Sequence, residues 1–441
     1  MIILRIGSTT VSYSRYIDLL MNPEIELLIF LADKRDSFIK NLTKFFSSSK
    51  FSEIYKKKVR IYEFELSNIK RVIRGILYRS SRFSIEGEFI RLFTRELAPA
   101  LEFMMSLYFR RSQIDTLKNV INTYSPDFIW SGSNDFDGSN FITWYVKESH
   151  GENIPLIRSY KEHRCRFVLD EKKALELSDA LVLPSLRNTE ILERIYSLDL
   201  KSKTLIADED WRSSYVIDYV RSISVSKLSS IDGHPHVVIL TGVATYGTHD
   251  YRRGSRYNYL KIIRELVKSR VYVHLHTKNI IERTGSSKIS LSNPYTKLAE
   301  ESEFFKIEKP LDLEYNLEDY LILKRYDAGI LHNYVEGEPI SLFTKINIPN
   351  RLYEYQIADV LPIVISNTML DVEDIIKDTG FGIIASDYSE VSEKLMEIVR
   401  RNRKPIIFEG ELPTFGKFVD ILLNAYNITK KFKGNKYSGR L

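Results

Sequence analysis

Short apolar runs alternate with amphipathic helical segments along the first half of the chain. The runs are rich in branched residues and predict strands at 2–6, 25–31, 59–64, 128–130, 156–157, 180–183 and 204–206. Helical patterns lie between them, over 115–124, 141–150 and 170–177. Short, continuously apolar strands are typical of a parallel sheet that helices cover on both faces. The alternation therefore predicts a doubly wound, Rossmann-like α/β domain.

The alternation stops near residue 207 and restarts near residue 236. Residues 207–235 lack strand periodicity and run into the turn-rich stretch "SSIDGHPH". Six apolar runs then follow: "HVVILTG", "RVYVHLHT", "FFKIEKP", "YDAGILH", "LPIVIS" and "FGIIAS". We therefore predict an N-terminal Rossmann-like domain over 1–206, a linker over 207–235, a second Rossmann-like domain over 236–412, and a C-terminal helix with a basic tail over 413–441.

Length and composition narrow the classes of protein that remain. At 441 residues, the chain is too long for one hydrophobic core and suits two domains. Its 64 Lys and Arg against 58 Asp and Glu give a net charge of +6, which suits phosphate-bearing ligands or an anionic membrane surface. This excess is too weak to indicate nucleic-acid binding. Only two glutamines accompany abundant Lys, Glu and Ile, which hints at a thermophilic source.

The number of cysteines and the length of the apolar runs indicate the cellular compartment in which the protein is expected. Cys165 is the single cysteine, so no internal disulfide framework is expected, and the chain fits a reducing compartment. The N-terminal "MIILRIGSTT" lacks the basic start and the long apolar run of a signal peptide, so we interpret it as a first strand. No apolar run approaches the roughly 20 residues that span a bilayer. We expect a cytoplasmic protein, either soluble or peripheral at the inner face of the membrane.

The loop over 241–260 is the first candidate for phosphate binding, because ligands of open α/β sheets bind beyond the carboxyl ends of the strands. It carries Gly242, and then Arg252 and Arg253 shortly before a helix. Backbone amides and guanidinium groups at a helix start suit a diphosphate. Thr277, in the next strand-end loop "HLHTKN", is expected to face the same ligand. The loop matches neither G-x-G-x-x-G nor the P-loop, and a solvated basic turn is the alternative interpretation.

The stretch "NIPNRLYEYQIADVLPIVIS", residues 347–366, places Glu354 one turn into a predicted helix at the same edge of the sheet. A carboxylate there can accept hydrogen bonds from two adjacent ribose hydroxyls of a nucleotide. Asn350, at the start of the helix, is expected to help hold that nucleotide. The alternative is a solvated carboxylate that is favoured only by the helix dipole.

Three segments carry a resemblance to a known family. "PNRLYEYQIADVLPIV" resembles the "P-N-K-L-x-E-Y-x-A-x-G-x-P-V" segment of retaining GT-B glycosyltransferases in the large family 4 group. "KRYDAGILHN" and "EKKALELSDALVLPS" resemble two further segments of that family. The resemblance covers most of the second domain and the end of the first. It implies a GT-B-like α/β fold, with two Rossmann-like doubly wound domains facing each other across a cleft, and a nucleotide diphosphate sugar as donor substrate without a further cofactor.

The family signature has two glutamates eight positions apart, and this chain departs from it. Its candidates are Glu336, followed by Gly337, and Glu354, whereas Ile346 stands where strict spacing places the first glutamate. Arg253 stands at the family's phosphate-binding lysine, as the resemblance aligns it. We expect Glu336 and Gly337 to hold the donor sugar, and Arg252 and Arg253 to stabilise the leaving diphosphate as charge develops on it. This guanidinium charge makes a metal unnecessary.

The acceptor is expected to bind at the strand-end loops of the first domain, residues 7–15, 131–140 and 158–166. Their candidate sugar-hydroxyl partners are Ser8, Asn134, Asp135, Asp137 and Asn140. His163 lies where the resemblance implies a histidine facing the reacting sugar carbon, although local hydrogen bonding or solvent exposure is the commoner use of a lone His. "HPH" and "HLH" lack cysteine or carboxylate partners in the sequence, so no metal site is predicted.

A basic helical region spans residues 68–111, where Arg and Lys interleave with Ile, Leu, Met, Phe and Tyr. This pattern suits a membrane surface or a lipid-linked acceptor. An ordinary amphipathic helix pair with arginines on its solvated side is the alternative interpretation.

Together these features predict a metal-independent, hexosyltransferase-type glycosyltransferase. It would move a sugar from a nucleotide diphosphate sugar to a hydroxyl on a glycan or lipid-linked glycan, and retention follows from the resemblance alone. Two alternatives stay open: a nucleotide-sugar epimerase on the same scaffold, and a degenerate, non-catalytic nucleotide-sugar-binding subunit. An epimerase would require paired acid and base groups, and Asp135 and Asp137 are the nearest to such a pair.

Overall fold

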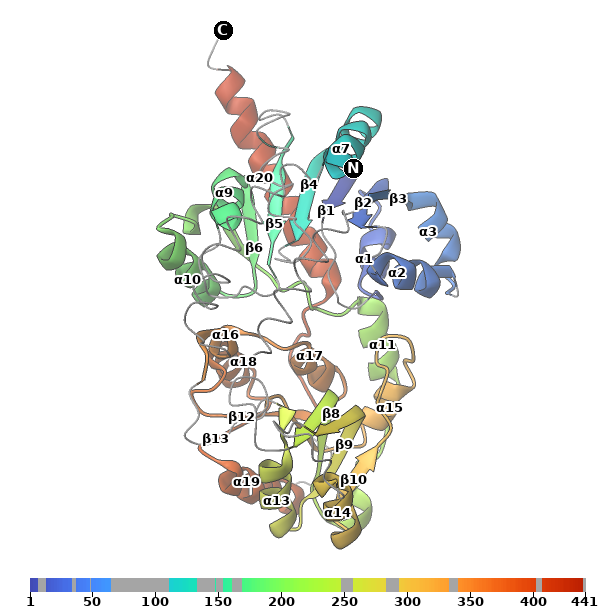
Figure 1. The fold of residues 1–441 in the computed structure, drawn as a ribbon, viewed down its shortest axis with the longest axis vertical. Helices are drawn as coiled ribbons and strands as arrows, with labels where there is room; N and C mark the ends of the chain where they lie inside the picture. Colours follow the sequence, from blue (N-terminus) through green and yellow to red (C-terminus); the bar gives the residue numbers. More distant parts are fainter. Residues whose placement is uncertain are drawn as a thin grey trace, which may run out of the picture. The chain divides into compact units, whose positions relative to one another are not determined.

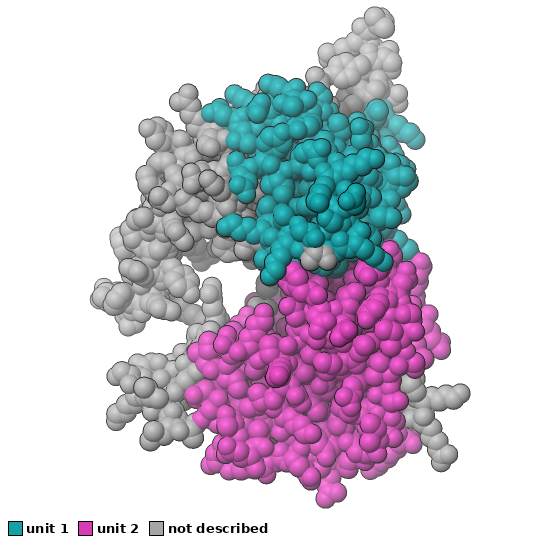
Figure 2. All heavy atoms as spheres, turned by 90° about the vertical axis from the view of Figure 1, so that its right-hand side faces the viewer, with its two compact units in different colours: residues 1–210, 415–441 teal, residues 211–414 magenta. Residues whose placement is uncertain are grey.

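The computed structural model describes residues 1–6, 13–33, 37–47, 49–64, 111–132, 147, 154–160, 169–246, 257–282, 293–332, 340–401 and 407–438. The chain divides into two compact units (Figure 2). Unit 1 comprises Met1–Asp210 and Phe415–Leu441, and unit 2 comprises Trp211–Thr414. The chain therefore passes from one unit to the other at two points, before Trp211 and after Thr414.

Unit 1 is built on a parallel sheet that, in the described ranges, has seven strands (Figure 1). They are β1 (Ile2–Ile6), β2 (Leu27–Asp33), β3 (Val59–Phe64), β4 (Phe128–Gly132), β5 (Leu156–Ser159), β6 (Ala180–Leu183) and β7 (Thr204–Ile206), in the order β3-β2-β1-β4-β5-β6-β7. The order reverses between β1 and β4, as in doubly wound folds. All residues of β4, β5 and β6 are buried, which explains why these residues are apolar or small apart from Arg158 of β5.

Helices flank the sheet of unit 1. They are α1 (Tyr16–Met21), α2 (Ser37–Ser47), α3 (Ser52–Lys58), α7 (Arg111–Tyr124), α9 (Leu169–Leu177), α10 (Leu186–Tyr196) and α20 (Phe415–Ser438). The α10 helix begins where Ser185, directly after the strand-ending Pro184, accepts a hydrogen bond from the Asn188 backbone N–H at 3.1 Å. This is the N-cap arrangement that satisfies an otherwise unpaired amide of the first turn.

The C-terminal helix α20 is an integral part of unit 1. Its Phe415, Phe418 and Leu422 are fully buried, and Phe418 lies against Trp130 of β4. The Gly416 backbone N–H donates to the Asp18 carboxylate of α1 at 2.8 Å. The last segment of the chain thereby completes the core of the first domain.

Unit 2 contains a second parallel sheet, with six strands in its described part (Figure 1). They are β8 (His236–Tyr246), β9 (Tyr272–Glu282), β10 (Phe305–Glu308), β11 (Ala328–Ile330), β12 (Leu361–Ile365) and β13 (Ile383–Ala385), in the order β10-β9-β8-β11-β12-β13. The helices are α11 (Ser214–Ser222), α12 (Ser229–Asp232), α13 (Leu260–Lys268), α14 (Pro294–Glu301), α15 (Asp319–Leu323), α16 (Leu342–Ile346), α17 (Asn350–Ile357), α18 (Leu370–Thr379) and α19 (Tyr388–Arg401). Here the order reverses between β8 and β11.

These observations confirm the predicted fold class of two Rossmann-like, doubly wound α/β domains. The compact units follow different bounds from the predicted domains. Residues 211–235, predicted as part of a linker, belong to unit 2 and include α11 and α12. The α11 helix is structured because Val216, Ile217 and Val220 form one buried face in the core of unit 2. The C-terminal helix, predicted as a separate segment, belongs to unit 1.

The predicted strands occur in the structure, with shifted ends at some of them. The β8 and β9 strands extend to Tyr246 and Glu282, beyond the apolar runs that predicted them. The predicted helix over 141–150 lies outside the described residues except for Lys147. None of the helices in the described ranges combines the length and apolar character that crossing a membrane requires.

Candidate functional site

The switch point between β8 and β11 is the position in unit 2 where the fold favours ligand binding, beyond the carboxyl ends of the strands. Helix α17 is anchored there (Figure 1). Arg351 donates from Nη1 to the Leu240 carbonyl oxygen on β8 at 2.7 Å. The Tyr355 hydroxyl donates to the Ile330 carbonyl oxygen at the end of β11 at 3.2 Å. These two bonds hold one face of α17 against the last residue of β11 and against Leu240, directly past the point where β8 stops pairing with β11.

Close packing reinforces this attachment. Gly329 of β11 lies under the ring of Tyr355, and a Cβ atom at Gly329 would meet that ring at 2.4 Å. Burial raises the pKa of the Tyr355 hydroxyl, so it stays protonated and remains a donor. The absence of a side chain at Gly329 therefore allows α17 to approach the sheet closely.

Glu354 lies on α17 three residues after Arg351, and its carboxylate forms an ion pair with Arg212. The same guanidinium also reaches Glu314, with 3.4 Å between Arg212 Nη1 and Glu314 Oε2. The Arg212 and Glu354 side chains are 5% and 12% exposed. Glu354 is thus a mostly buried, charge-paired carboxylate at the carboxyl edge of the sheet. This environment differs from the solvated helix-start carboxylate that the sequence left as an alternative.

The other described donor-site candidates lie around the same strand ends. Gly242 is exposed within β8, two residues past the contact of Arg351 with Leu240, and a Cβ there would have nothing within 4 Å. Thr277 is buried opposite Thr241 on β9, and its hydroxyl donates to the Asn279 carbonyl oxygen at 3.0 Å. Asn350 is the half-buried first residue of α17. The open backbone at Gly242 gives room for a phosphorylated ligand, and the Glu354 carboxylate on α17 adds polarity at the same switch point.

Comparison with known proteins concerns the fold. No protein-family model matches the sequence, and no curated protein matches it. Among solved structures, a glycosyltransferase from Rickettsia africae ESF-5 has a TM-score of 0.51 at 12% identity, covering 98% of this chain and 98% of that chain. HepE of Anabaena, solved in complex with UDP, has a TM-score of 0.51 at 9% identity, covering 99% of both chains. The fold is GT-B-like.

In this GT-B-like fold, most of the predicted site residues lie outside the described ranges. They are Ser8, Asn134, Asp135, Asp137, Asn140, His163, Arg252, Arg253, Glu336 and Gly337. Of the predicted set, the described ranges contain Gly242 on β8, Thr277 on β9, and Asn350 and Glu354 on α17. The structure adds Arg351, Tyr355 and Arg212, which the sequence did not single out.

A buried polar network at the switch point of unit 1 was also missed. Arg5 of β1 is fully buried, stacks 3.9 Å over the Trp130 ring and donates from Nη2 to Glu209 at 3.4 Å. Ser159 of β5 donates to the same carboxylate and accepts from Trp130 Nε1 at 2.7 Å. Gly132 leaves space for this arginine, because a Cβ there would meet Arg5 Nη2 at 2.5 Å. The network fixes the carboxyl ends of β1, β4 and β5.

Two further buried arginines extend this network. Arg15 donates to the Glu209 carbonyl oxygen at 2.6 Å. Arg158 of β5 donates to the Tyr160 hydroxyl at 2.8 Å and to Ser131 of β4 at 3.3 Å. Burial raises the pKa of Tyr160, which keeps its hydroxyl neutral. The sequence signal was an arginine inside the apolar runs "IILRI" and "LIRS", where a charge is rare unless it is paired.

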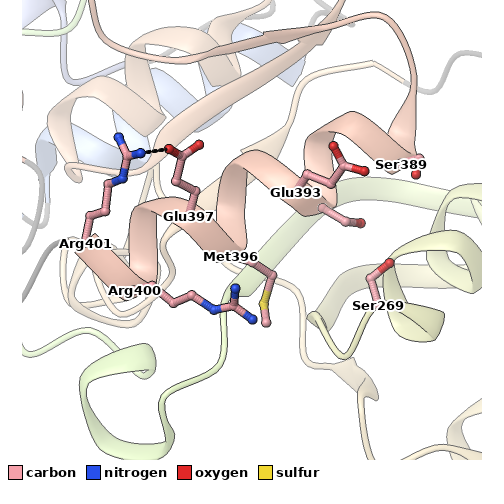
Figure 3. Close-up of a pocket in the computed structure, with 8 residues that line it drawn as sticks. Ser269, Ser389, Glu393, Met396, Glu397, Arg400 and Arg401 are labelled. Atoms are coloured by element: carbon pink, nitrogen blue, oxygen red, sulfur yellow. Dashed lines mark ion pairs between the residues drawn. The ribbon is translucent and has the colours of Figure 1, made fainter.

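In the described ranges, no metal cluster lies at the switch point, and the pocket of Figure 3 lies elsewhere in unit 2. In the ranges that the structure describes, no group of three or more His, Cys, Asp or Glu side chains could hold a metal ion. A pocket of about 460 Å³ lies between α19 and Ser269, just past the end of α13 (Figure 3). Glu393, Met396 and Arg400 line it, and Arg401 pairs with Glu397 beside them at 2.5 Å. Ser269 precedes β9, so this pocket lies toward the amino ends of the strands.

Proposed function

We propose that the protein is a glycosyltransferase that uses a nucleotide diphosphate sugar as donor. One observation carries the proposal: Glu354, a mostly buried carboxylate in an ion pair, sits on a helix anchored to both β8 and β11 at the switch point of unit 2. A carboxylate at this position of a doubly wound domain suits the two hydroxyls of a ribose. The similarity in fold to HepE, which was solved with UDP, supports a nucleoside diphosphate as the ligand.

In this proposal each part of the donor has its own partners. Glu354 and Asn350 hold the nucleotide, and the open backbone at Gly242 lets the diphosphate approach β8. Arg252 and Arg253 offset the charge that develops on the leaving diphosphate, which is where electrostatic stabilisation speeds the reaction most. Glu336 and Gly337 hold the donor sugar. Thr277 provides a further contact to the donor.

The reaction is transfer of a hexosyl group to a hydroxyl. The acceptor oxygen forms a bond to the anomeric carbon and loses its proton, while the bond from that carbon to the diphosphate breaks and the diphosphate keeps the electron pair. His163 would line the reacting carbon. The acceptor contacts would come from Ser8, Asn134, Asp135, Asp137 and Asn140. Retention at the anomeric carbon and independence of metal ions belong to the same proposal.

Thermal-shift screening with UDP, GDP, ADP and their sugars, with EDTA present, tests donor binding. We expect at least one diphosphate to raise the melting temperature, because a ligand that binds only the folded state stabilises it. Mass spectrometry of reactions that contain the stabilising nucleotide sugar and candidate glycans or lipid-linked glycans then tests transfer. No stabilisation by any of these nucleotides would contradict the proposal.

The products distinguish the alternatives that the sequence left open. Glycosylated acceptor and free nucleoside diphosphate, formed in equal amounts, support the glycosyltransferase. An epimerised nucleotide sugar that appears without acceptor would instead indicate an epimerase. Binding without turnover on any acceptor would indicate a non-catalytic nucleotide-sugar-binding subunit.

A further inference from the structure

We infer that Arg212 is a positioning residue that orients Glu354 for the ribose of the donor. The inference rests on the proposed function and goes beyond it, because it assigns the preference for ribose over deoxyribose to a residue that does not itself contact the ribose. Arg212 and Glu354 are separated by 142 positions in the sequence and meet through a buried ion pair.

The backbone and the side chain of Arg212 are both held in place. Arg212 forms a parallel β-bridge with Thr414, and the neighbouring Trp211 packs against the core of unit 2. Its guanidinium spans two carboxylates, with Nη2 on Glu354 and Nη1 on Glu314. A planar guanidinium with donors in a fixed fork holds two such partners in a defined geometry, which a flexible ammonium group does not.

The ion pair with Arg212 uses one oxygen atom of the Glu354 carboxylate and leaves the other oxygen atom for a ligand. Arg212 donates to Oε1. In the described part of the chain, Oε2 carries no hydrogen bond, and it is not among the polar atoms that are buried without a partner. An ionised oxygen with two lone pairs at this position can accept from both ribose hydroxyls. Arg212 thus sets the direction in which Oε2 points.

Loss of Arg212 would leave a carboxylate that is 12% exposed without its positive partner. An uncompensated, partly buried charge is costly, so the Glu354 side chain would turn toward water and regain its rotamer freedom. Its hydrogen bonds to the ribose would weaken, while contacts to the base and the diphosphate would persist. The expected signature is a loss of discrimination at the sugar, rather than a general loss of binding.

The test compares UDP, GDP and ADP with their 2′-deoxy and 3′-deoxy forms by calorimetry. For the diphosphate that wild type binds most tightly, we expect a preference of about tenfold or more over each deoxy form, typical of hydrogen bonds to a charged group. In Arg212→Gln the affinity for the diphosphate should exceed the affinity for each deoxy form by about threefold or less. Arg212→Lys, which keeps the charge without the fork, provides a second variant if Arg212→Gln does not fold, and its preference should also fall.

Arg221→Gln is the matched control. Arg221 lies on α11 and donates to the Phe408 carbonyl oxygen at 3.0 Å, so its loss affects stability without touching Glu354. This variant should keep the wild-type preference. If a folded Arg212 variant keeps the wild-type preference, the inference is wrong and the proposed function still stands. The same holds if wild type binds a diphosphate and its deoxy forms equally well. Failure of wild type to bind any of the three diphosphates would overturn the proposed function, and the inference with it.

Discussion

At the scale of single residues, Glu354 combines a structural role with the ribose-binding role that we propose for it. Its ion pair with Arg212 holds the carboxylate in place, and its position beside Arg351 and Tyr355 puts it at the ends of β8 and β11. A buried ion pair is by itself weak evidence for stability, because desolvation offsets much of the attraction. A charged group kept at the ligand-binding edge of the sheet is better explained by a polar ligand.

Replacement of Glu354 by Gln should weaken binding of the preferred nucleoside diphosphate by about 1–3 kcal/mol, because a charge-assisted hydrogen bond to the ribose is lost. Calorimetry measures this difference. The control is Glu373→Gln, which alters a buried glutamate on α18 of the same unit. The control should leave affinity unchanged. If Glu354→Gln binds as tightly as wild type and its circular dichroism is unaltered, Glu354 does not contact the ribose.

The sequence predicted Glu354 and missed Arg212 for a physical reason. Glu354 sits in a local pattern, an extended Ile348-Pro349 followed by a helix and a buried strand, and local patterns are what periodicity reveals. Arg212 acts through a contact across 142 positions, within a stretch that has no strand periodicity. A partner at that distance becomes visible only when the chain is folded.

At the scale of elements, the apolar runs located the strands well, because most strands of both sheets are buried on both faces. The ends of β8 and β9 extend furthest beyond the apolar runs that predicted them, and they pair with each other from Val243 and Asn279 onward. The neighbouring β11 pairs with β8 only as far as Ile239, so this extension lies beyond the main sheet. Ala244 and Thr245 are buried, but the other residues of the extension up to Ile281 are at least partly exposed, and polar residues interrupt it. A search for apolar runs therefore ended before it.

The contact between β11 and α17 leads to a prediction about stability. Gly329→Ala should destabilise the protein by about 1–3 kcal/mol, because the new methyl group would collide with the buried ring of Tyr355. It should also weaken diphosphate binding, since α17 must move away from the strand ends. Gly242→Ala adds the same methyl group in open space and serves as the stability control. Equal melting temperatures for the two variants in differential scanning fluorimetry would contradict this account of the packing.

A chain of polar side chains with two buried histidines at its centre crosses the other end of the same sheet. His236 Nε2 lies 2.9 Å from Asp232 Oδ2, and its Nδ1 lies 2.9 Å from His274 Nε2. His274 Nδ1 lies 3.2 Å from Glu308 Oε1 on β10. Burial lowers the pKa of His236, and it lowers the pKa of His274 to about 4 even though Glu308 opposes the shift. Both rings are therefore neutral at pH 7.

The lowered pKa values predict that acid destabilises unit 2. The folded state disfavours protonation of His274, so the unfolded state takes up its proton first as the pH falls below about 6.5. Stability should decline from there until about pH 4, where the folded state is protonated as well. His274 alone accounts for roughly 2–3 kcal/mol of this loss.

Urea unfolding of wild type and His274→Gln between pH 7 and pH 4 measures this effect. His274→Gln removes the titrating group, so its stability should decline less steeply over this range. His234→Gln, which changes a neighbouring histidine outside the hydrogen-bonded chain, is the control and should follow wild type. A His274→Gln variant with the same decline as wild type would show that other groups set the acid sensitivity.

At the scale of the whole molecule, the sequence revealed two domains but placed their bounds imperfectly. The segment after β7 looked like a linker, yet Asp208, Glu209 and Asp210 are buried in unit 1 and Arg212 is buried in unit 2. Charged residues usually mark solvated loops, so a buried charged segment is invisible to hydropathy. The amphipathic pattern predicted α20 as a helix, whereas its membership of unit 1 depends on contacts with α1 and β4 far back in the chain.

The whole-molecule prediction concerns the acceptor, and it depends on the basic region over 68–111, which lies outside the described residues up to Arg111 at the start of α7. If this region docks on an anionic membrane, each basic residue near the surface contributes about 1 kcal/mol. The protein should then sediment with anionic vesicles at low salt and less at moderate salt, because salt screens such contacts. A variant with five arginines neutralised should lose this binding: Arg71, Arg74, Arg79, Arg110 and Arg111.

A control variant that loses the same number of positive charges on unit 2 tests whether vesicle binding depends on the basic region or only on the net charge of the protein. Its five substitutions neutralise exposed basic residues of the second domain: Lys261, Arg264, Lys268, Arg270 and Lys297. This control should still sediment with the vesicles, since its basic region is intact. If wild type does not bind anionic vesicles, or if both variants bind as well as wild type, the region is not a membrane surface. The hydroxyl acceptor of the proposed transfer is then a soluble glycan rather than a lipid-linked one.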